Sequence, residues 1–490
     1  MGNTFAIGQM AKSKPSFLCL LILIPALLSA QITFQRTYGG DSSDAAWAVQ
    51  QTADRGYVLA GRTGSFGAGG LDAWLVRTDS LGDTLWTRAF GGAAHDIANS
   101  VQQTSDHGYI LTGWTTSFGA GDYDAWLIRT DSSSDTLWTR TYGGAAYDGG
   151  FSVQVAADHG YILAGRTSSF GAGEDDVWLI RTDSLGDVLW SRTFGGIYDD
   201  FAFWVQQTPD RGYILACNTE SFGPGDQDVW LIKTDSLGDT LWTRTFGGSE
   251  WEEVYSVQQT ADKGYILTGG TSSFGAGSID AWIIKTDSVG DTLWTKTLGG
   301  AVDDYANSAQ QTPDRGYMIA GYTLSFGAGD EDAWLIRMDS LGDTLWARTL
   351  GGGGDEWLNS VRQTADRGYI LVGTTWSYGV GGDAWLIKTD SLGNIGVAEE
   401  RPMPNPGRMA FTCEPNPCRG TAAIHVLGTR SELEDNSVLS LRVYDATGRL
   451  ILQSATRSLQ SQTALDLRAF PAGVYTVRLD SATQRLVVQR

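Results

Sequence analysis

Acidic side chains recur along this 490-residue chain at an almost constant spacing, and their carboxylates are the first groups to consider for chemistry. One set, spaced by 52 residues, comprises Asp44, Asp96, Asp148, Asp200, Glu252, Asp304 and Glu356. A second set comprises Asp72, Asp124, Asp176, Asp228, Asp280, Asp332 and Asp383. Carboxylate oxygens bind Ca²⁺ in proteins, so a ring formed by the first set is a candidate calcium site. The alternative role is structural, because a carboxylate at a strand start accepts backbone N–H bonds from an adjacent turn.

Aromatic or histidine side chains flank the first acidic set and change from one copy to the next. They are His95, Tyr147, Phe201, Trp251, Tyr305 and Trp357. Variable residues on a fixed frame are typical of recognition surfaces, where rings stack on sugars or anchor a protein loop. We therefore predict a binding site for a protein or glycan ligand at these positions. The alternative is that the six side chains fill gaps between loops.

These residues belong to a tandem repeat built around the phrase Asp-Ala-Trp-Leu and its close variants. Its tryptophans are Trp74, Trp126, Trp178, Trp230, Trp282, Trp334 and Trp385. Five intervals are 52 residues long and the last is 51. Each unit holds four short runs rich in β-branched and aromatic residues, separated by turn residues. Seven such units predict an all-β fold, a seven-bladed β-propeller of four-stranded blades over residues 31–393, with these tryptophans packed between sheets.

The two ends of the repeat array predict how the ring closes. Residues 34–40 read Phe-Gln-Arg-Thr-Tyr-Gly-Gly and align with residues 86–92, Trp-Thr-Arg-Ala-Phe-Gly-Gly. The seventh unit lacks this strand after residue 393. We expect the N-terminal strand near residues 33–38 to complete the last blade, which leaves no open sheet edge.

Signatures of catalysis are scarce. The chain has 4 histidines, and none recurs where a channel is expected. No nucleophile elbow, zinc-ligand spacing or phosphate loop is present. Paired carboxylates are abundant, which keeps a polysaccharide-active hydrolase or lyase as the alternative function, but seven equivalent acids do not single out an acid and a base. We expect a non-catalytic binding or structural module with no cofactor other than the Ca²⁺ considered above.

The first 30 residues predict a secretory signal peptide. Lys12 and Lys14 precede an apolar run from Phe17 to Leu28, and a Leu-Ser-Ala cleavage site follows. No later segment approaches the roughly 18 apolar residues of a transmembrane helix, so we expect no integral membrane span.

The net charge bears on which partners the protein can bind, and the cysteine content bears on the cellular compartment. The formal net charge of −21 disfavours nucleic acid as a partner. Cys413 and Cys418 are close enough in sequence for a local disulfide in an exported protein, and both the paired and the free state stay open. We expect the protein to be a monomer.

One repeat hairpin carries a family resemblance. Residues 182–190 read Thr-Asp-Ser-Leu-Gly-Asp-Val-Leu-Trp. This segment resembles the tryptophan-docking turn of quinoprotein-type propellers and of repeat propellers in exported bacterial surface proteins. The resemblance covers roughly residues 31–393 and implies the fold. Quinoprotein dehydrogenases are expected to have eight blades and a paired-cysteine motif, so their activity does not carry over.

The C-terminal residues 415–490 have a different character. Their motifs are Pro-Asn-Pro-Cys-Arg-Gly at 415–420, Leu-Arg-Val-Tyr-Asp-Ala-Thr-Gly-Arg-Leu at 441–450 and Pro-Ala-Gly-Val-Tyr at 471–475. The residues alone predict a small antiparallel β-sandwich after a proline-containing linker at 394–414. The motifs resemble a type A C-terminal sorting domain of type IX secretion. This resemblance implies a Gram-negative source, the type IX secretion machinery as a partner, and export to the outer-membrane surface or the extracellular space.

Overall fold

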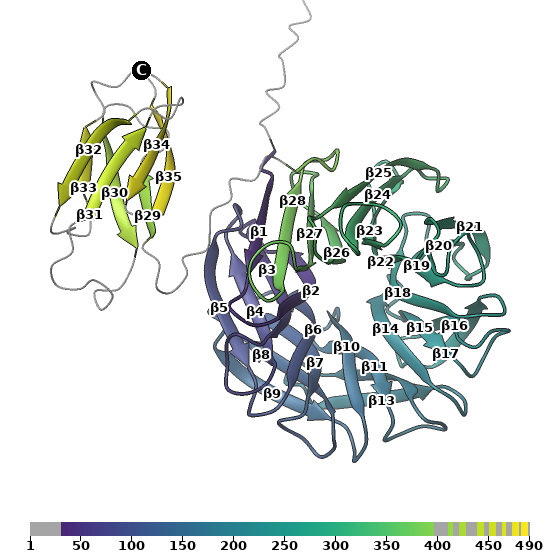
Figure 1. Ribbon diagram of the computed structural model, residues 1–490. Helices are drawn as coiled ribbons and strands as arrows, with labels where there is room; N and C mark the ends of the chain where they lie inside the picture. The colour runs from purple at the N-terminus through teal and green to yellow at the C-terminus, as the bar shows by residue number, and fades with distance from the viewer. Residues whose placement is uncertain are drawn as a thin grey trace, which may run out of the picture.

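The fold of the repeat region is a ring of seven antiparallel sheets (Figure 1). The computed structural model describes residues 31–395 and the strands between residues 410 and 488, and every described element is a strand. Each sheet of the ring has four strands. The predicted seven-bladed β-propeller is therefore confirmed. The predicted signal peptide and most of the linker lie outside the described residues.

Each blade runs from an inner strand, next to the ring axis, to an outer strand. The inner strands are β2 (Asp44–Gln51), β6 (Asp96–Gln103), β10 (Asp148–Val155), β14 (Asp200–Gln207), β18 (Glu252–Gln259), β22 (Asp304–Gln311) and β26 (Glu356–Gln363). The second strands are β3 (Tyr57–Thr63), β7 (Tyr109–Thr115), β11 (Tyr161–Thr167), β15 (Tyr213–Thr219), β19 (Tyr265–Thr271), β23 (Tyr317–Thr323) and β27 (Tyr369–Thr375). The third strands are β4 (Asp72–Thr78), β8 (Asp124–Thr130), β12 (Asp176–Thr182), β16 (Asp228–Thr234), β20 (Asp280–Thr286), β24 (Asp332–Met338) and β28 (Asp383–Thr389). The outer strands are β5 (Thr84–Phe90), β9 (Thr136–Tyr142), β13 (Val188–Phe194), β17 (Thr240–Phe246), β21 (Thr292–Leu298), β25 (Thr344–Leu350) and β1 (Phe34–Tyr38).

The strand register defines two ends of the ring. In the first blade Asp44 pairs with Thr63, and Thr63 pairs with Asp72, so the acidic strand starts share one end. We call this the upper face; it carries the loops between the second and third strands and the loops between blades. The opposite, lower face carries the two tight turns of each blade.

The ring closes through a strand from the other end of the array. β1 pairs with β28 in antiparallel register, with Thr37 opposite Trp385, and the last sheet has the order β1-β28-β27-β26. The predicted closure by the N-terminal strand is thus observed. Backbone hydrogen bonds tie the first residues of the array to its last blade, so that blade has no exposed outer edge at β28.

Apolar packing between neighbouring blades forms the core. The third strands are buried along their whole length, whereas the outer strands are mostly exposed. Trp126 lies in a cluster with Val58, Leu75 and Phe90 of the preceding blade, and is 4% exposed. Phe118 of the upper loop covers the same ring at 5.6 Å between centroids. The seven periodic tryptophans are all buried in this way, so each blade hides its apolar face only against its neighbour.

A second tryptophan in six of the seven blades packs on the lower turn of the next blade, and Phe34 of β1 takes its place in the seventh. Trp138 on β9 packs against Tyr161 with ring centroids 5.9 Å apart. Gly186 has φ +81° and lies so close to Trp138 that a Cβ there would meet the ring at 2.8 Å. Both constraints favour glycine, which occupies this turn position in six blades, whereas the second blade carries Ser134 with φ +65°.

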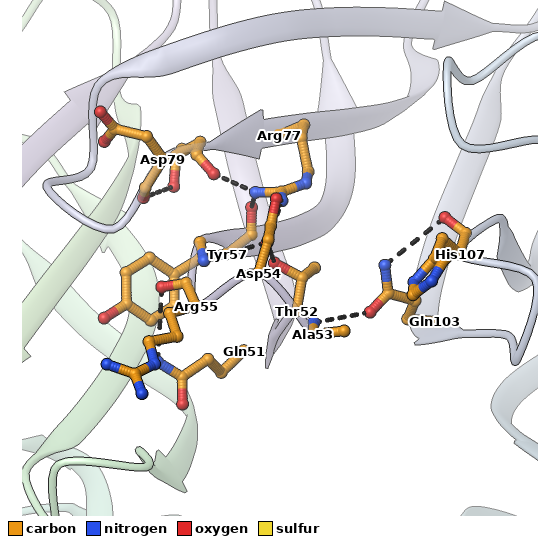
Figure 2. Close-up of polar contacts among 12 residues, drawn as sticks. Gln51, Thr52, Ala53, Asp54, Arg55, Tyr57, Arg77, Asp79, Gln103 and His107 are labelled. Carbon is orange, nitrogen blue, oxygen red and sulfur yellow. Dashed lines mark hydrogen bonds and ion pairs between the residues drawn. The ribbon is translucent and has the colours of Figure 1, made fainter.

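The other lower turn of each blade is organised by a buried cation (Figure 2). In the first blade Thr52 Oγ1 donates to Asp54 at 2.6 Å, and Arg77 forms an ion pair with the same carboxylate. Arg77 Nε also donates to Tyr109 OH of the next blade at 3.0 Å. Equivalent aspartate–cation pairs occur in all seven blades. These turns therefore fasten each blade internally and, in several cases, to its neighbour.

The described strands of the C-terminal region form two antiparallel sheets. One has the order β29-β30-β33, with β29 (Ala410–Glu414), β30 (Thr421–Leu427) and β33 (Thr463–Asp466). The other has the order β32-β31-β34-β35, with β31 (Leu439–Tyr444), β32 (Leu450–Thr456), β34 (Gly473–Leu479) and β35 (Ala482–Val488). The predicted Cys413–Cys418 disulfide lies outside the described side chains.

The lower-turn aspartates predict acid sensitivity. Partial burial opposes ionisation of Asp106, but bonds from the Thr104 hydroxyl, Arg129 and the Gly108 N–H lower its pKa to about 2. The folded pKa lies below the unfolded value of about 3.9, so the stabilisation is complete above about pH 4 and is lost as the pH falls toward about 2. We expect the thermal midpoint to drop over this range, and to drop less in Asp106→Asn.

The matched control for this measurement is Asp239→Asn. Asp239 pairs with Arg192 at the exposed surface, where an ion pair contributes little. Parallel pH curves for wild type and Asp106→Asn would contradict the role assigned to the turn.

Candidate functional site

The first acidic set lies on the upper face and is fully buried. Asp96, the first residue of β6, accepts hydrogen bonds from Ser117 Oγ at 2.7 Å and from Gly92 N at 2.9 Å, and the Thr115 hydroxyl also donates to it. Where the residue is glutamate, the longer side chain accepts instead from a backbone N–H, as Glu252 does from Ser273 at 3.0 Å. These carboxylates therefore join the inter-blade loop to the upper loop of the same blade.

The second acidic set holds the upper loops. Asp124 accepts bonds from Ala120 N and Gly121 N, each at 3.0 Å. Burial, followed by the nearby Asp44 carboxylate, raises the pKa of Asp383 to about 6. The two sets therefore meet where one blade adjoins the next.

The calcium hypothesis concerns Asp44, Asp96, Asp148, Asp200, Glu252, Asp304 and Glu356. Among residues 31–395 and the C-terminal strands, no group of three or more Asp, Glu, His or Cys side chains is placed to share a metal ion. The hydrogen bonds given above favour the structural role, and a calcium site stays a prediction.

A chelation experiment separates these roles. Because loop N–H and hydroxyl groups already engage these carboxylates, we expect the thermal midpoint to be the same in EDTA and in added CaCl₂. Calorimetric titration with CaCl₂ is the second measurement. A clear rise of the midpoint with calcium, together with measurable heat of binding, would establish the metal site.

A bulge in every inner strand leaves one residue, whose type varies between blades, without a partner on the second strand. In β2 the register with β3 shifts between Ala46 and Ala48, which leaves Trp47 unpaired. An unpaired bulge residue re-aims its side chain and breaks the two-residue alternation of the strand. The equivalent residues are Trp47, Asn99, Phe151, Phe203, Tyr255, Asn307 and Asn359. Phe203 lies 5.4 Å from Phe151 and 5.3 Å from Tyr255 between ring centroids, so residues of successive blades converge on the axis.

Two further variable positions face each other across the first two strands, above the bulge. In the sixth blade they are Tyr305 and Tyr322, which stack with ring centroids 4.7 Å apart. Tyr322 also contacts Trp357 of the seventh blade at 6.2 Å, and Trp357 Nε1 donates to Glu331. The structure thus unites the predicted residues Tyr305 and Trp357 in one aromatic cluster.

A second cluster contains Tyr147 and Phe201. Tyr147 packs on Tyr123 at 4.5 Å, and Arg166 Cζ lies 3.9 Å from the Tyr147 ring centroid and 6.0 Å from that of Phe201. Arg166 also pairs with Asp175 at 3.0 Å. The cation is therefore held between two aromatic rings and a carboxylate. It forms a rigid polar group at the opening of the channel on the upper face, which we call the mouth.

The other two predicted residues lie apart from these clusters. His95 is exposed, and its Nδ1 accepts a bond from Leu71 N at 3.0 Å, which fixes a loop. Trp251 is 43% exposed and has no ring contact among residues 31–395. His95 thus has a loop-fixing role, whereas Trp251 offers an open ring.

Carboxyl groups of perturbed acidity gather on one side of the mouth. Burial raises the pKa of Glu253, although hydrogen bonds to Tyr255 and Trp251 oppose the shift. Burial also raises the pKa of Glu331, with a further contribution from Asp355. A carboxylate accepts a hydrogen bond from a hydroxyl, and a protonated carboxyl can also donate one. The mouth therefore combines aromatic rings for stacking with acids that bind hydroxyl groups.

Sequence reasoning missed about half of this lining. Arg166, Phe203, Glu253, Tyr322 and Glu331 were not predicted. Each stands at a fixed repeat position whose residue type changes between blades, and that signal was available in the alignment of the units. For Phe203 the bulge is the further obstacle, because strict alternation along β14 does not predict the direction of an unpaired residue.

Comparison with known proteins identifies the C-terminal region. Residues 414–490 match the family described as the secretion system C-terminal sorting domain. The resemblance expected from the motifs is therefore confirmed, and the protein is exported through type IX secretion to the cell surface or the extracellular space. None of the described residues forms a helix with the length and hydropathy needed to cross a bilayer.

The propeller is similar to proteins of several kinds. The regulatory protein FlaEY of Caulobacter vibrioides is 22% identical over 400 residues, which cover 66% of this chain and 40% of that protein. This chain therefore matches less than half of the relative's length.

Similar solved structures include the Pan2 WD40 domain of Neurospora crassa and a protein of unknown function from Dyadobacter fermentans. The first has a TM-score of 0.44 and 9% identity, and covers 72% of this chain and 91% of that chain. The second has a TM-score of 0.39 and 12% identity, and covers 72% and 98%. These values carry no inference about ligand or activity.

Proposed function

We propose that the exported propeller is a non-catalytic binding module whose upper mouth holds a glycan. This proposal rests on a contrast between two kinds of position in the repeat, those of the scaffold and those that face the channel. Tryptophans, glycines and acids of the scaffold repeat from blade to blade, whereas the channel-facing positions carry different aromatic and charged residues. A scaffold alone does not require this variation, but a ligand with distinct faces does.

The chemistry of the mouth favours a polyhydroxylated ligand. Rings such as Trp251 present an apolar face on which a sugar ring stacks, and Glu331 and Glu253 supply hydrogen-bonding groups beside them. Arg166 is already paired with Asp175, so it contributes a fixed donor surface and not a free charge. A protein loop is the other ligand class for the same surface.

The test is glycan-array screening of the full mature chain, followed by calorimetry on the best ligand. Trp357→Ala introduces the residue that the first blade carries as Ala45, and Tyr322→Thr introduces the residue of the seventh blade, Thr374. We expect each variant to weaken binding about fivefold, because an aromatic contact is worth about 1 kcal/mol.

Leu189→Ala is the control, because Leu189 is 58% exposed on the outer strand β13. It should bind as wild type does. Binding that is equal in all three variants would place the ligand elsewhere, and the absence of any glycan ligand would favour a protein partner.

Glu253 and Glu331 sustain one alternative, a polysaccharide-active hydrolase or lyase. Both carboxyls have raised pKa values, as a general acid requires. Burial raises the pKa of the nearby Tyr305 hydroxyl, and the negative charge of each carboxylate raises it further. Release of reducing ends from a bound polysaccharide measures this activity. We expect none; turnover that is lost in Glu253→Gln or Glu331→Gln would replace the binding proposal with catalysis.

A further inference from the structure

The lower part of the channel contains a cation with no carboxylate partner. Six inner strands carry glutamine at one position, namely Gln50, Gln102, Gln154, Gln206, Gln258 and Gln310, whereas the seventh carries Arg362. Two residues earlier in the repeat, the fourth blade carries Trp204 where the others have alanine or serine. Arg362 Cζ lies 5.0 Å from the Trp204 ring centroid. The two departures from the repeat therefore meet, although they come from the fourth and seventh blades.

These side chains line a cavity of about 120 Å³. Its polar lining comes from Gln154, Gln206, Gln258 and Gln310, with Ser256 and Arg362. The oxygens of the first three glutamines accept bonds from backbone N–H groups of the next blades, at 2.8, 2.7 and 2.7 Å. The NH₂ groups of these three amides take no part in those bonds and can donate to a ligand. The cavity therefore offers several donors, from Arg362 and these three amides, while Gln310 donates its own Nε2 to Gln311 O at 3.3 Å.

The charge of Arg362 is uncompensated within the part of the chain that the structure describes. Its guanidinium donates to Val361 O at 2.9 Å, and no carboxylate lies within ion-pair distance of it there. Burial lowers its pKa to about 10, so the side chain stays protonated at neutral pH. By contrast, the buried cation of every lower turn has an aspartate partner. A desolvated cation without an anion is costly, and an external anion would remove that cost.

The turns around the lower opening of the channel carry basic residues in a backbone conformation that is unfavourable for them. The tips of the turns between first and second strands are Arg55, His107, His159, Arg211, Lys263, Arg315 and Arg367, all exposed and all with φ between 65° and 71°. The left-handed conformation costs a non-glycine residue about 1 kcal/mol. Glycine or asparagine would suit these positions better, yet five of the seven are cations. These turns directly follow the inner strands, so their charges surround the lower opening and attract anions toward it.

We propose that the lower channel binds an oxyanion, the carboxylate, sulfate or phosphate group of a small ligand, through Arg362 and the amide NH₂ groups of Gln154, Gln206 and Gln258. A guanidinium pairs with such groups through two parallel N–H bonds, and the amides supply further donors. The site is separate from the upper mouth and does not depend on the glycan proposal.

The test is calorimetric titration of the full mature chain with sodium sulfate, phosphate, acetate and glucuronate at constant ionic strength. Glucose serves as the neutral comparison for glucuronate. Arg362→Gln installs the residue that the other six blades carry, so the fold should be preserved. We expect at least one anion to bind wild type, and its affinity to fall at least tenfold in Arg362→Gln.

Two further variants complete the experiment. Arg192→Gln removes an exposed cation from β13, and Leu189→Ala removes an exposed apolar side chain from the same strand; both should leave anion binding unchanged. Binding of sulfate or phosphate alone identifies an inorganic ion as the ligand, and stronger binding of glucuronate identifies an acidic sugar. No heat with any anion, or equal affinity in Arg362→Gln, would overturn the proposal.

Discussion

The structure depends on the fact that no blade covers its own apolar surface. Each third strand is buried against the sheet beside it, and residues such as Trp126 belong to two blades at once. Every blade therefore needs a neighbour to cover its apolar surface, and the last blade obtains one only when β1 pairs with β28 and the ring closes. Ring closure is therefore the condition under which every other contact is satisfied, which explains why backbone pairing, buried cations and docked tryptophans all operate between neighbours.

With the apolar packing placed between the blades, several positions on the channel wall can differ from one blade to the next. The acids of the repeating ring, for example Asp96 and Glu252, accept hydrogen bonds that hold loops together, although Asp44 and Asp148 each keep one buried oxygen without a partner among the described residues. The residues that differ between blades lie on the inner strands, on the second strands and in the upper loops, and they gather at two different ends of the channel. Aromatic rings and acids occupy the upper end, while donors and cations occupy the lower end. One scaffold thus presents two openings of opposite chemical character.

Much of the fold could be predicted, because a 52-residue period and the match between residues 34–40 and 86–92 determine blade number and closure. The position of Tyr305 and Trp357 at the mouth also followed from the repeat. Burial of the acids could not be deduced, since it depends on hydroxyls such as Ser117 that approach from 21 residues away. The positions of Phe203 and Arg362 in the channel could not be predicted from the sequence. Phe203 is an unpaired bulge residue, and Arg362 meets Trp204 of a blade that is distant in the chain.

The closing strand also has a consequence for the order of folding. Residues 34–38 pair with residues 384–388, so the first strand to be made or exported has no sheet to join until the last blade has arrived. A chain that emerges from its N-terminus cannot lock the ring part-way. Contacts of such long sequence separation form slowly, which keeps the array open until it is complete. The same pairing that stabilises the finished propeller therefore makes closure of the ring a late step of folding.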